Sequence, residues 1–165
     1  MTATVPLTSW QFAAAVALPM LAGSVVTALP RVGTASVQKD YASTAKPAWS
    51  PPPWLFGVVW PILYALMGAA SFLVWNDEKA TKEARRAALG LYAAQLVLNL
   101  VWSPVYFGLG ARAAALGILL LLDVVVALTI LAFARVNPTA AWLMAPYAAW
   151  LAVATALNAS VVAMN

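Results

Sequence analysis

Long uncharged segments alternate with short charged ones along this chain of 165 residues. Each uncharged segment can hold a helix of about 20 residues, the length that crosses a hydrocarbon layer of about 30 Å. The segments are 1–30, 47–76, 87–111, 113–134, which only Asp123 interrupts, and 136–165. The pattern predicts five transmembrane helices, near residues 9–29, 54–75, 85–107, 113–134 and 139–163.

Helices are favoured over strands because lipid cannot satisfy exposed backbone groups, and the segments lack the alternation of a barrel strand. Hydrophobic residues make up 64% of the chain and charged residues only 8%, which does not fit a soluble domain. The first segment has no Lys or Arg before it, unlike a secretory signal, and we interpret it as a span. We expect an all-α integral membrane protein, a five-transmembrane-helix bundle forming one domain over residues 1–165, with a long loop at 30–53.

The composition also limits the chemistry that the protein can perform. The chain has no Cys and no His, which excludes disulfides, thiolate chemistry and imidazole ligands, so we expect no metal site and no cofactor. The net charge of +4 comes from nine basic residues near the predicted membrane boundaries. Such scattered charges are typical of contacts with lipid headgroups, and we expect no binding of nucleic acid.

The predicted helix at 85–107 carries polar and aromatic residues on one face. Their spacing of three and four residues forms a stripe, made by Tyr92, Gln95, Asn99, Trp102 or Ser103, and Tyr106. Because amides in hydrocarbon need partners, the stripe should face the bundle interior. Gln95 and Asn99 either contact a ligand or only bond to neighbouring helices, and the sequence leaves both interpretations open.

Two other predicted helices repeat this design. One carries Trp60 and Tyr64, and the last carries Tyr147, Trp150, Ala154 and Asn158. Tryptophans at membrane boundaries are usually interfacial anchors, which explains Trp10, Trp75 and Trp142. Trp60 and Trp150 lie about two turns inside their spans, and a cavity lined by indoles, phenols and an amide suits a planar aromatic ligand.

Three further features allow two interpretations each. The proline-rich segment from Trp49 to Trp54 is stiff, and it is either a lid over helix ends or a connector into the second helix. Asp123, in the middle of a span, is either a functional acid or a helix-to-helix hydrogen-bonding group. Gly90 and Ala94 form a small-xxx-small step, which serves either a homodimer or packing within the chain.

Four segments together resemble signature sequences of the TspO/translocator family, also known as tryptophan-rich sensory proteins. They read KPAWSPP at 46–52, VWPILY at 59–64, QLVLNLVWSP at 95–104 and PYAAW at 146–150. They occur in the family's order and spacing, so the resemblance extends from about residue 40 to the end. One departure stands out, because Asp40 occupies the position before Tyr41 where family members often carry a tryptophan.

The resemblance implies a multi-pass protein of a bacterial cell membrane, commonly dimeric, that acts as a receptor or sensor for porphyrins such as protoporphyrin IX. Two alternatives stay open, an enzyme that degrades porphyrin with Trp60 and Trp150 as its catalytic residues, and a transporter of porphyrin or sterol. Lys46 is expected to meet the acidic groups of the ligand. Together, the residues and the resemblance give a ligand-binding set of Trp49, Trp60, Tyr64, Asn99, Trp102, Tyr147, Trp150 and Ala154.

Overall fold

The computed structural model describes residues 9–29 and 32–165, where all regular structure is helical. In this part of the chain, five helices are long and apolar enough to cross a membrane, which confirms the prediction of a multi-pass integral membrane protein. The long helices are α1 (Ser9–Thr27), α3 (Pro53–Trp75), α4 (Lys82–Ser103), α5 (Arg112–Val136) and α6 (Pro138–Met164). The shorter elements are α2 (Thr34–Ser43) and the π-helical turn η1 (Pro104–Gly108).

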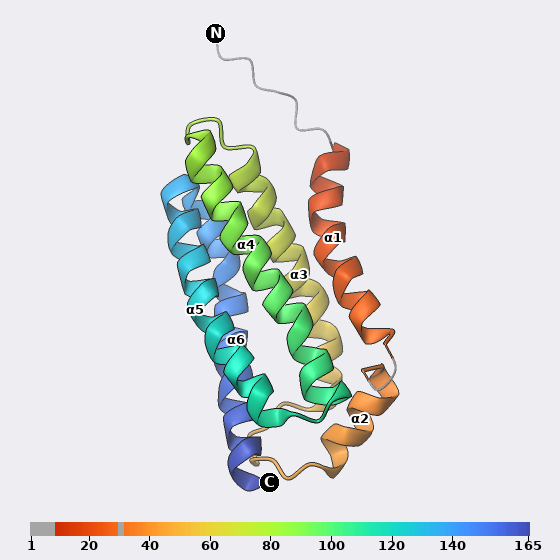
Figure 1. Cartoon of the computed structure of the whole chain (residues 1–165). Helices are drawn as coiled ribbons and strands as arrows, with labels where there is room; N and C mark the ends of the chain where they lie inside the picture. The colour runs from red at the N-terminus through yellow and green to blue at the C-terminus, as the bar shows by residue number, and fades with distance from the viewer. Residues whose placement is uncertain (1–8, 30–31) are drawn as a thin grey trace.

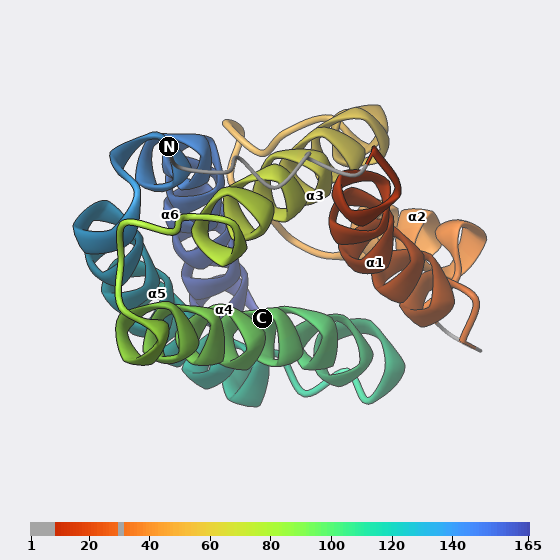
Figure 2. The ribbon, with the colours of Figure 1, turned by 90° about the horizontal axis from the view of Figure 1, so that it is seen from above.

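The five long helices run roughly side by side and form an elongated bundle (Figure 1). Seen from above, they follow one another around the bundle in the order α1, α3, α6, α5 and α4 (Figure 2). Helix α1 packs mainly along α3 and touches α4 more sparingly. Helix α2, η1 and the C-terminus lie at the lower end of Figure 1, opposite the α3–α4 connection.

Local sequence signals start the helices that follow the connections. The hydroxyl of Thr81 accepts a hydrogen bond from the backbone N–H of Ala84 at 3.2 Å, and the side chain of Asn137 caps Ala140 at the same distance. Both caps satisfy a helix N–H that would otherwise lack a partner. Asn137 also donates to Asp77 at 3.0 Å, which ties the α5–α6 turn to the α3–α4 loop.

A glycine allows α1 to approach α3 closely. Gly68 is buried, and a Cβ atom placed there would lie 2.6 Å from Cα of Val16 and even closer to the carbonyl oxygen of Ala15. Both neighbours are backbone atoms, which cannot move away without moving the helix. Contact between α1 and α3 therefore requires glycine at this position.

The expected loop at 30–53 contains α2, which sequence analysis did not predict. This helix has only ten residues and is largely polar, so it carries no signal of a span. Tertiary contacts hold its end, where Arg112 at the start of α5 forms a 3.3 Å ion pair with Asp40 and donates to the hydroxyl of Thr44 at 2.8 Å. Such contacts are not visible in local sequence.

The predicted third span changes its helical form near its end. Pro104 has no N–H to donate, and the chain continues as a π-helical turn in which Leu109 N–H bonds to the Pro104 carbonyl at 3.0 Å. Gly110, with a φ of 65°, then allows the tight turn into α5. The wider turn brings Tyr106 and Phe107 next to Trp102, with ring centroids 5.1 and 5.9 Å from the indole.

We predict that Gly68→Ala destabilises the bundle by about 1–3 kcal/mol, because overpacking must push α1 away from α3. Thermal unfolding in detergent measures this change. Gly117→Ala on α5 is the matched control, since a Cβ there meets nothing within 4 Å. An equal melting temperature for the two variants would contradict the close-packing argument.

Candidate ligand-binding site

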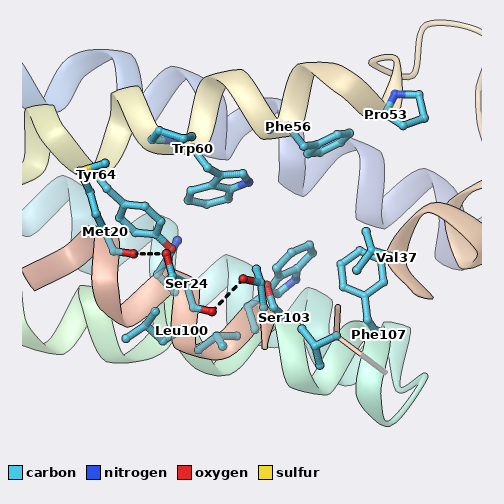
Figure 3. Close-up of a pocket in the computed structure, with 18 of the residues that line it drawn as sticks. Met20, Ser24, Val37, Pro53, Phe56, Trp60, Tyr64, Leu100, Ser103 and Phe107 are labelled. Atoms are coloured by element: carbon cyan, nitrogen blue, oxygen red, sulfur yellow. Dashed lines mark hydrogen bonds between the residues drawn. The ribbon is translucent and has the colours of Figure 1, made fainter. Parts of the chain in front are cut away.

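A cavity of about 400 Å³ lies between α1, α3 and α4, at the end of the bundle that carries α2. Its wall is mainly apolar and aromatic, with a few hydroxyl and amide groups (Figure 3). The lining residues are Met20, Gly23, Ser24, Val26, Thr27, Val32, Val37, Tyr41, Pro53, Trp54, Phe56, Gly57, Trp60, Pro61, Tyr64, Asn99, Leu100, Trp102, Ser103 and Phe107.

Helix α3 supplies the aromatic wall of this cavity. Phe56, Trp60 and Tyr64 follow one another at a spacing of four residues, so all three point from the same face into the space seen in Figure 3. The rings of Trp60 and Tyr64 are tilted by 32°, with centroids 5.4 Å apart. Tyr64 fits because Gly23 on α1 has no side chain, and a Cβ there would lie 2.6 Å from the phenol ring.

Asn99 joins three helices beside the cavity. Its Oδ1 accepts a hydrogen bond from the Tyr64 hydroxyl at 2.9 Å, and its Nδ2 donates to the Tyr147 hydroxyl at 3.1 Å. The residue is 5% exposed and still lines the cavity. An amide has two N–H groups and two lone pairs, so one of each stays free of these bonds and can meet a ligand.

A second, much smaller cavity of about 40 Å³ lies next to the first, against α6. Trp150 and Ala154 line this second cavity and do not line the main one. Its wall also includes Asn158, whose Oδ1 accepts a hydrogen bond from the indole N–H of Trp102 at 3.3 Å. Trp102 borders both cavities.

The segment after α2 closes one end of the site. The hydroxyl of Tyr41 donates to the carbonyl of Pro51 at 2.6 Å, which ties α2 to the proline-rich segment. Burial raises the pKa of Tyr41, with a smaller opposing effect from Ser50, so the phenol keeps the proton it donates. Lys46 lies 4.8 Å above the Tyr41 ring and donates to the Tyr41 carbonyl at 2.6 Å. Lys46 is therefore engaged by its own segment and does not line either cavity.

The structure gathers only part of the expected binding set around one space. Trp60, Tyr64, Asn99 and Trp102 line the main cavity, while Trp150 and Ala154 line the small one. Two expected residues line neither, because Tyr147 is fully buried behind Asn99 and Trp49 is 54% exposed.

The polar stripe on α4 faces the interior, as predicted, with Tyr92, Gln95 and Asn99 all buried. Asn99 bonds to neighbouring helices. The amide of Gln95 finds no hydrogen-bond partner among the residues that the structure describes. Asn99 therefore bonds between helices and also borders the main cavity, whereas Gln95 does neither among the described residues.

Sequence analysis missed the contribution of α1 and two phenylalanines. Met20, Gly23 and Ser24 had no aromatic or amide pattern to mark them. Phe56 does have a signal, because it precedes Trp60 by one helical turn. The position of Phe107 in the cavity wall depends on the π-helical turn, which moves this residue out of the regular helical register.

Asp123 takes part in a contact between helices, away from both cavities. Its Oδ2 accepts a hydrogen bond from the hydroxyl of Thr155 on α6 at 2.8 Å. Within residues 9–29 and 32–165, no three acidic side chains gather in a group that could hold a metal ion. The hydrogen-bonding interpretation of Asp123 therefore agrees with its surroundings.

Comparison with known proteins shows that similar chains occur in animals and bacteria. The model of the TspO/MBR family matches residues 15–164. The human "Translocator protein" is 46% identical over 118 residues, covering 72% of this chain and 70% of that protein. "Tryptophan-rich protein TspO" of Chlorobaculum tepidum is 40% identical over 125 residues, covering 76% and 78%. "Tryptophan-rich sensory protein" of Cereibacter sphaeroides is 38% identical over 125 residues, covering 76% of each.

We predict that Asn99 and Tyr147 are energetically coupled by about 0.6 kcal/mol and by no more than about 1.7 kcal/mol, as for other hydrogen bonds between membrane helices. The measurement is a double-mutant cycle on the free energy of unfolding in detergent, made with Asn99→Ala, Tyr147→Phe and the double variant. The control is the pair Asn99→Ala and Trp142→Phe, whose effects should add because Trp142 is exposed and forms no hydrogen bond with Asn99. Purely additive effects of Asn99→Ala and Tyr147→Phe would rule out a stabilising bond.

Proposed function

The chain belongs to the TspO/MBR family of membrane proteins, and from this membership and the cavity we propose that it is a receptor or sensor for a planar tetrapyrrole such as protoporphyrin IX. The observation that carries the proposal is the aromatic cavity itself. A volume of about 400 Å³ lies within the range of small-molecule sites, roughly 300–1,000 Å³. The largely apolar wall suits a ligand that partitions into membranes.

Stacking on α3 supplies most of the proposed affinity. Trp60 offers an indole face toward the cavity, and Tyr64 continues the surface one turn further (Figure 3). Aromatic pairs contribute about 0.5–1.5 kcal/mol beyond the burial of their area. A flat conjugated ligand therefore gains more from this wall than a flexible aliphatic lipid of the same area.

A few polar groups would orient the ligand. The free N–H of Asn99 is available to a ring nitrogen or carbonyl acceptor. Ser24, Thr27 and Ser103 place hydroxyl groups in the wall, and the first two donate to backbone carbonyls at 2.9 Å. These hydroxyl oxygens can still accept hydrogen bonds, so the acidic groups of a porphyrin would lie near them when protonated.

The separation of the two tryptophans sets a condition that degradation must meet and that binding need not. An enzyme that uses both Trp60 and Trp150 needs both indoles next to one ligand. Trp60 lines the main cavity and Trp150 lines the small one, with Phe56 forming part of both walls. A ligand against Trp60 alone fits the main cavity as it stands, whereas contact with both indoles requires Phe56 to move.

We predict that Trp60→Leu weakens protoporphyrin IX binding about tenfold, because loss of the stacked indole removes about 1.4 kcal/mol. Titration with quenching of tryptophan fluorescence measures the dissociation constant in detergent. Trp142→Leu is the control, since Trp142 is exposed on α6 and lines neither cavity. Absence of saturable quenching in the unmodified protein, or equal weakening by both substitutions, would refute the proposal.

We also propose a homodimer through the outer face of α4. Gly90 and Ala94 are both exposed, and a Cβ at Gly90 would meet nothing within 4 Å. The alternative of packing against another helix of the same chain therefore does not apply to these residues. Small side chains one turn apart let two helices approach closely in lipid, which supports contact with a second copy.

We predict that Gly90→Leu shifts the detergent-solubilised protein from dimer toward monomer, because four added carbon atoms keep the two helices apart. Light scattering coupled to size-exclusion chromatography reports the mass. Gly117→Leu makes the same change on the outer face of α5, where a Cβ also has open space, and should leave the dimer intact. A dimer that persists in Gly90→Leu would exclude this face of α4.

A further inference from the structure

The two cavities are separated by a wall of four aromatic side chains. Tyr41, Phe56, Trp102 and Phe107 line both of them. The main cavity ends at this wall, and Trp150 with Ala154 lies behind it. The wall therefore decides how far across the bundle a ligand can extend.

Most of this wall is held firmly in place. Tyr41 is tied to the Pro51 carbonyl by its hydroxyl. Trp102 donates to the buried side chain of Asn158. Phe107 packs on Trp102 and on Tyr106, with ring centroids 5.9 and 4.7 Å apart, inside the tight connection around η1.

Phe56 is held more weakly and stands directly in front of Trp150. Its ring meets Tyr41 and Trp150 edge to face, with both centroids 5.6 Å away. A phenyl ring has no group for a hydrogen bond, and Phe56 is only half-buried on the first turns of α3. Rotation about its side-chain bonds therefore breaks only two ring contacts and no hydrogen bond.

The space behind Phe56 has an unused donor. The indole N–H of Trp150 is buried and has no hydrogen-bond partner among residues 9–29 and 32–165. A buried donor without a partner is unfavourable because it has lost its bonds to water, and an acceptor on a ligand would remove this cost. Ala154, one turn further along α6, leaves room beside the indole.

We propose that Phe56 is a gate that sets the width of ligand the site accepts. Displacement of its ring joins the two cavities into one slot that runs from Trp60 to Trp150. The edge of a flat macrocycle then replaces the phenyl ring against Trp150, and an acceptor on that edge bonds to the indole N–H. This inference rests on the proposed tetrapyrrole binding and specifies which residue selects the ligand.

The gate distinguishes ligands by size. A two-ring aromatic molecule fits the main cavity and leaves Phe56 in place. A tetrapyrrole is wider and gains the second indole only by displacing the ring. The small cavity, at about 40 Å³, has room for little more than one water molecule while the gate is closed.

The absence of cysteine makes the test specific, because any introduced thiol is the only one in the protein. Ala154→Cys places a thiol behind the gate, and Ser103→Cys places one in the main cavity as the control. Each is combined with native Phe56, with Phe56→Ala and with Phe56→Trp. Mass spectrometry then follows modification by methyl methanethiosulfonate, with and without saturating protoporphyrin IX or 2-naphthol.

We expect the Ala154→Cys thiol to react at least tenfold faster with Phe56→Ala than with native Phe56, and Phe56→Trp to keep it slow. The rate at Ser103→Cys should be unchanged by either substitution, which also shows that the variants fold. Protoporphyrin IX should protect both thiols when Phe56 is present, whereas 2-naphthol should protect only Ser103→Cys.

The outcomes separate this inference from the proposed function. If protoporphyrin IX protects neither thiol, tetrapyrrole binding itself is wrong. If it protects Ser103→Cys and leaves Ala154→Cys reactive, binding stands and the gate is refuted. Equal reactivity of Ala154→Cys with native Phe56 and with Phe56→Ala also overturns the gate.

Discussion

The hydrogen bonds of Asn99 hold together the part of the bundle on which the site depends. One amide joins Tyr64 on α3 to Tyr147 on α6, and so connects three helices at a depth where lipid offers no substitute for a lost partner. The bond to Tyr64 fixes the phenol at the cavity wall, and Tyr147 closes the space behind it. The aromatic face of α3 keeps its direction because the amide is buried between these two hydroxyl groups.

The end of the site is closed by a different set of interactions, in which charge has a larger part. Asp40 takes the position where members of the family often carry a tryptophan, and here it pairs with Arg112 at 3.3 Å. Both side chains are partly exposed, so the pair contributes no more than about 1 kcal/mol. Arg112 also bonds to Thr44, and its carbonyl accepts a hydrogen bond from Asn158 at 3.0 Å. This network joins α2 to α5 and α6 without an indole.

Residues of the main cavity were predictable where a polar or aromatic side chain recurred at helical spacing. Trp60, Tyr64 and Asn99 could be assigned to one site because their chemistry is out of place against lipid. Phe56 shares their helical face, but a phenyl ring is equally at home in lipid, so periodicity alone did not mark it. The glycine and serine that α1 contributes, Gly23 and Ser24, likewise have no signal until the helix is placed.

The sequence by itself determined the number of spans and their approximate ends, because hydrophobic length follows from the thickness of the bilayer. It also determined the inward face of α4, because amides at helical spacing are unfavourable against lipid. Only the tertiary structure decided which aromatic residues share a cavity. Trp60 and Trp150 look equivalent in sequence, yet Phe56 and the other shared rings divide them. The same holds for α2, whose ten residues are ordered by Arg112 from a segment far along the chain. Contacts between distant segments depend on the order of helices around the bundle, which local pattern does not encode.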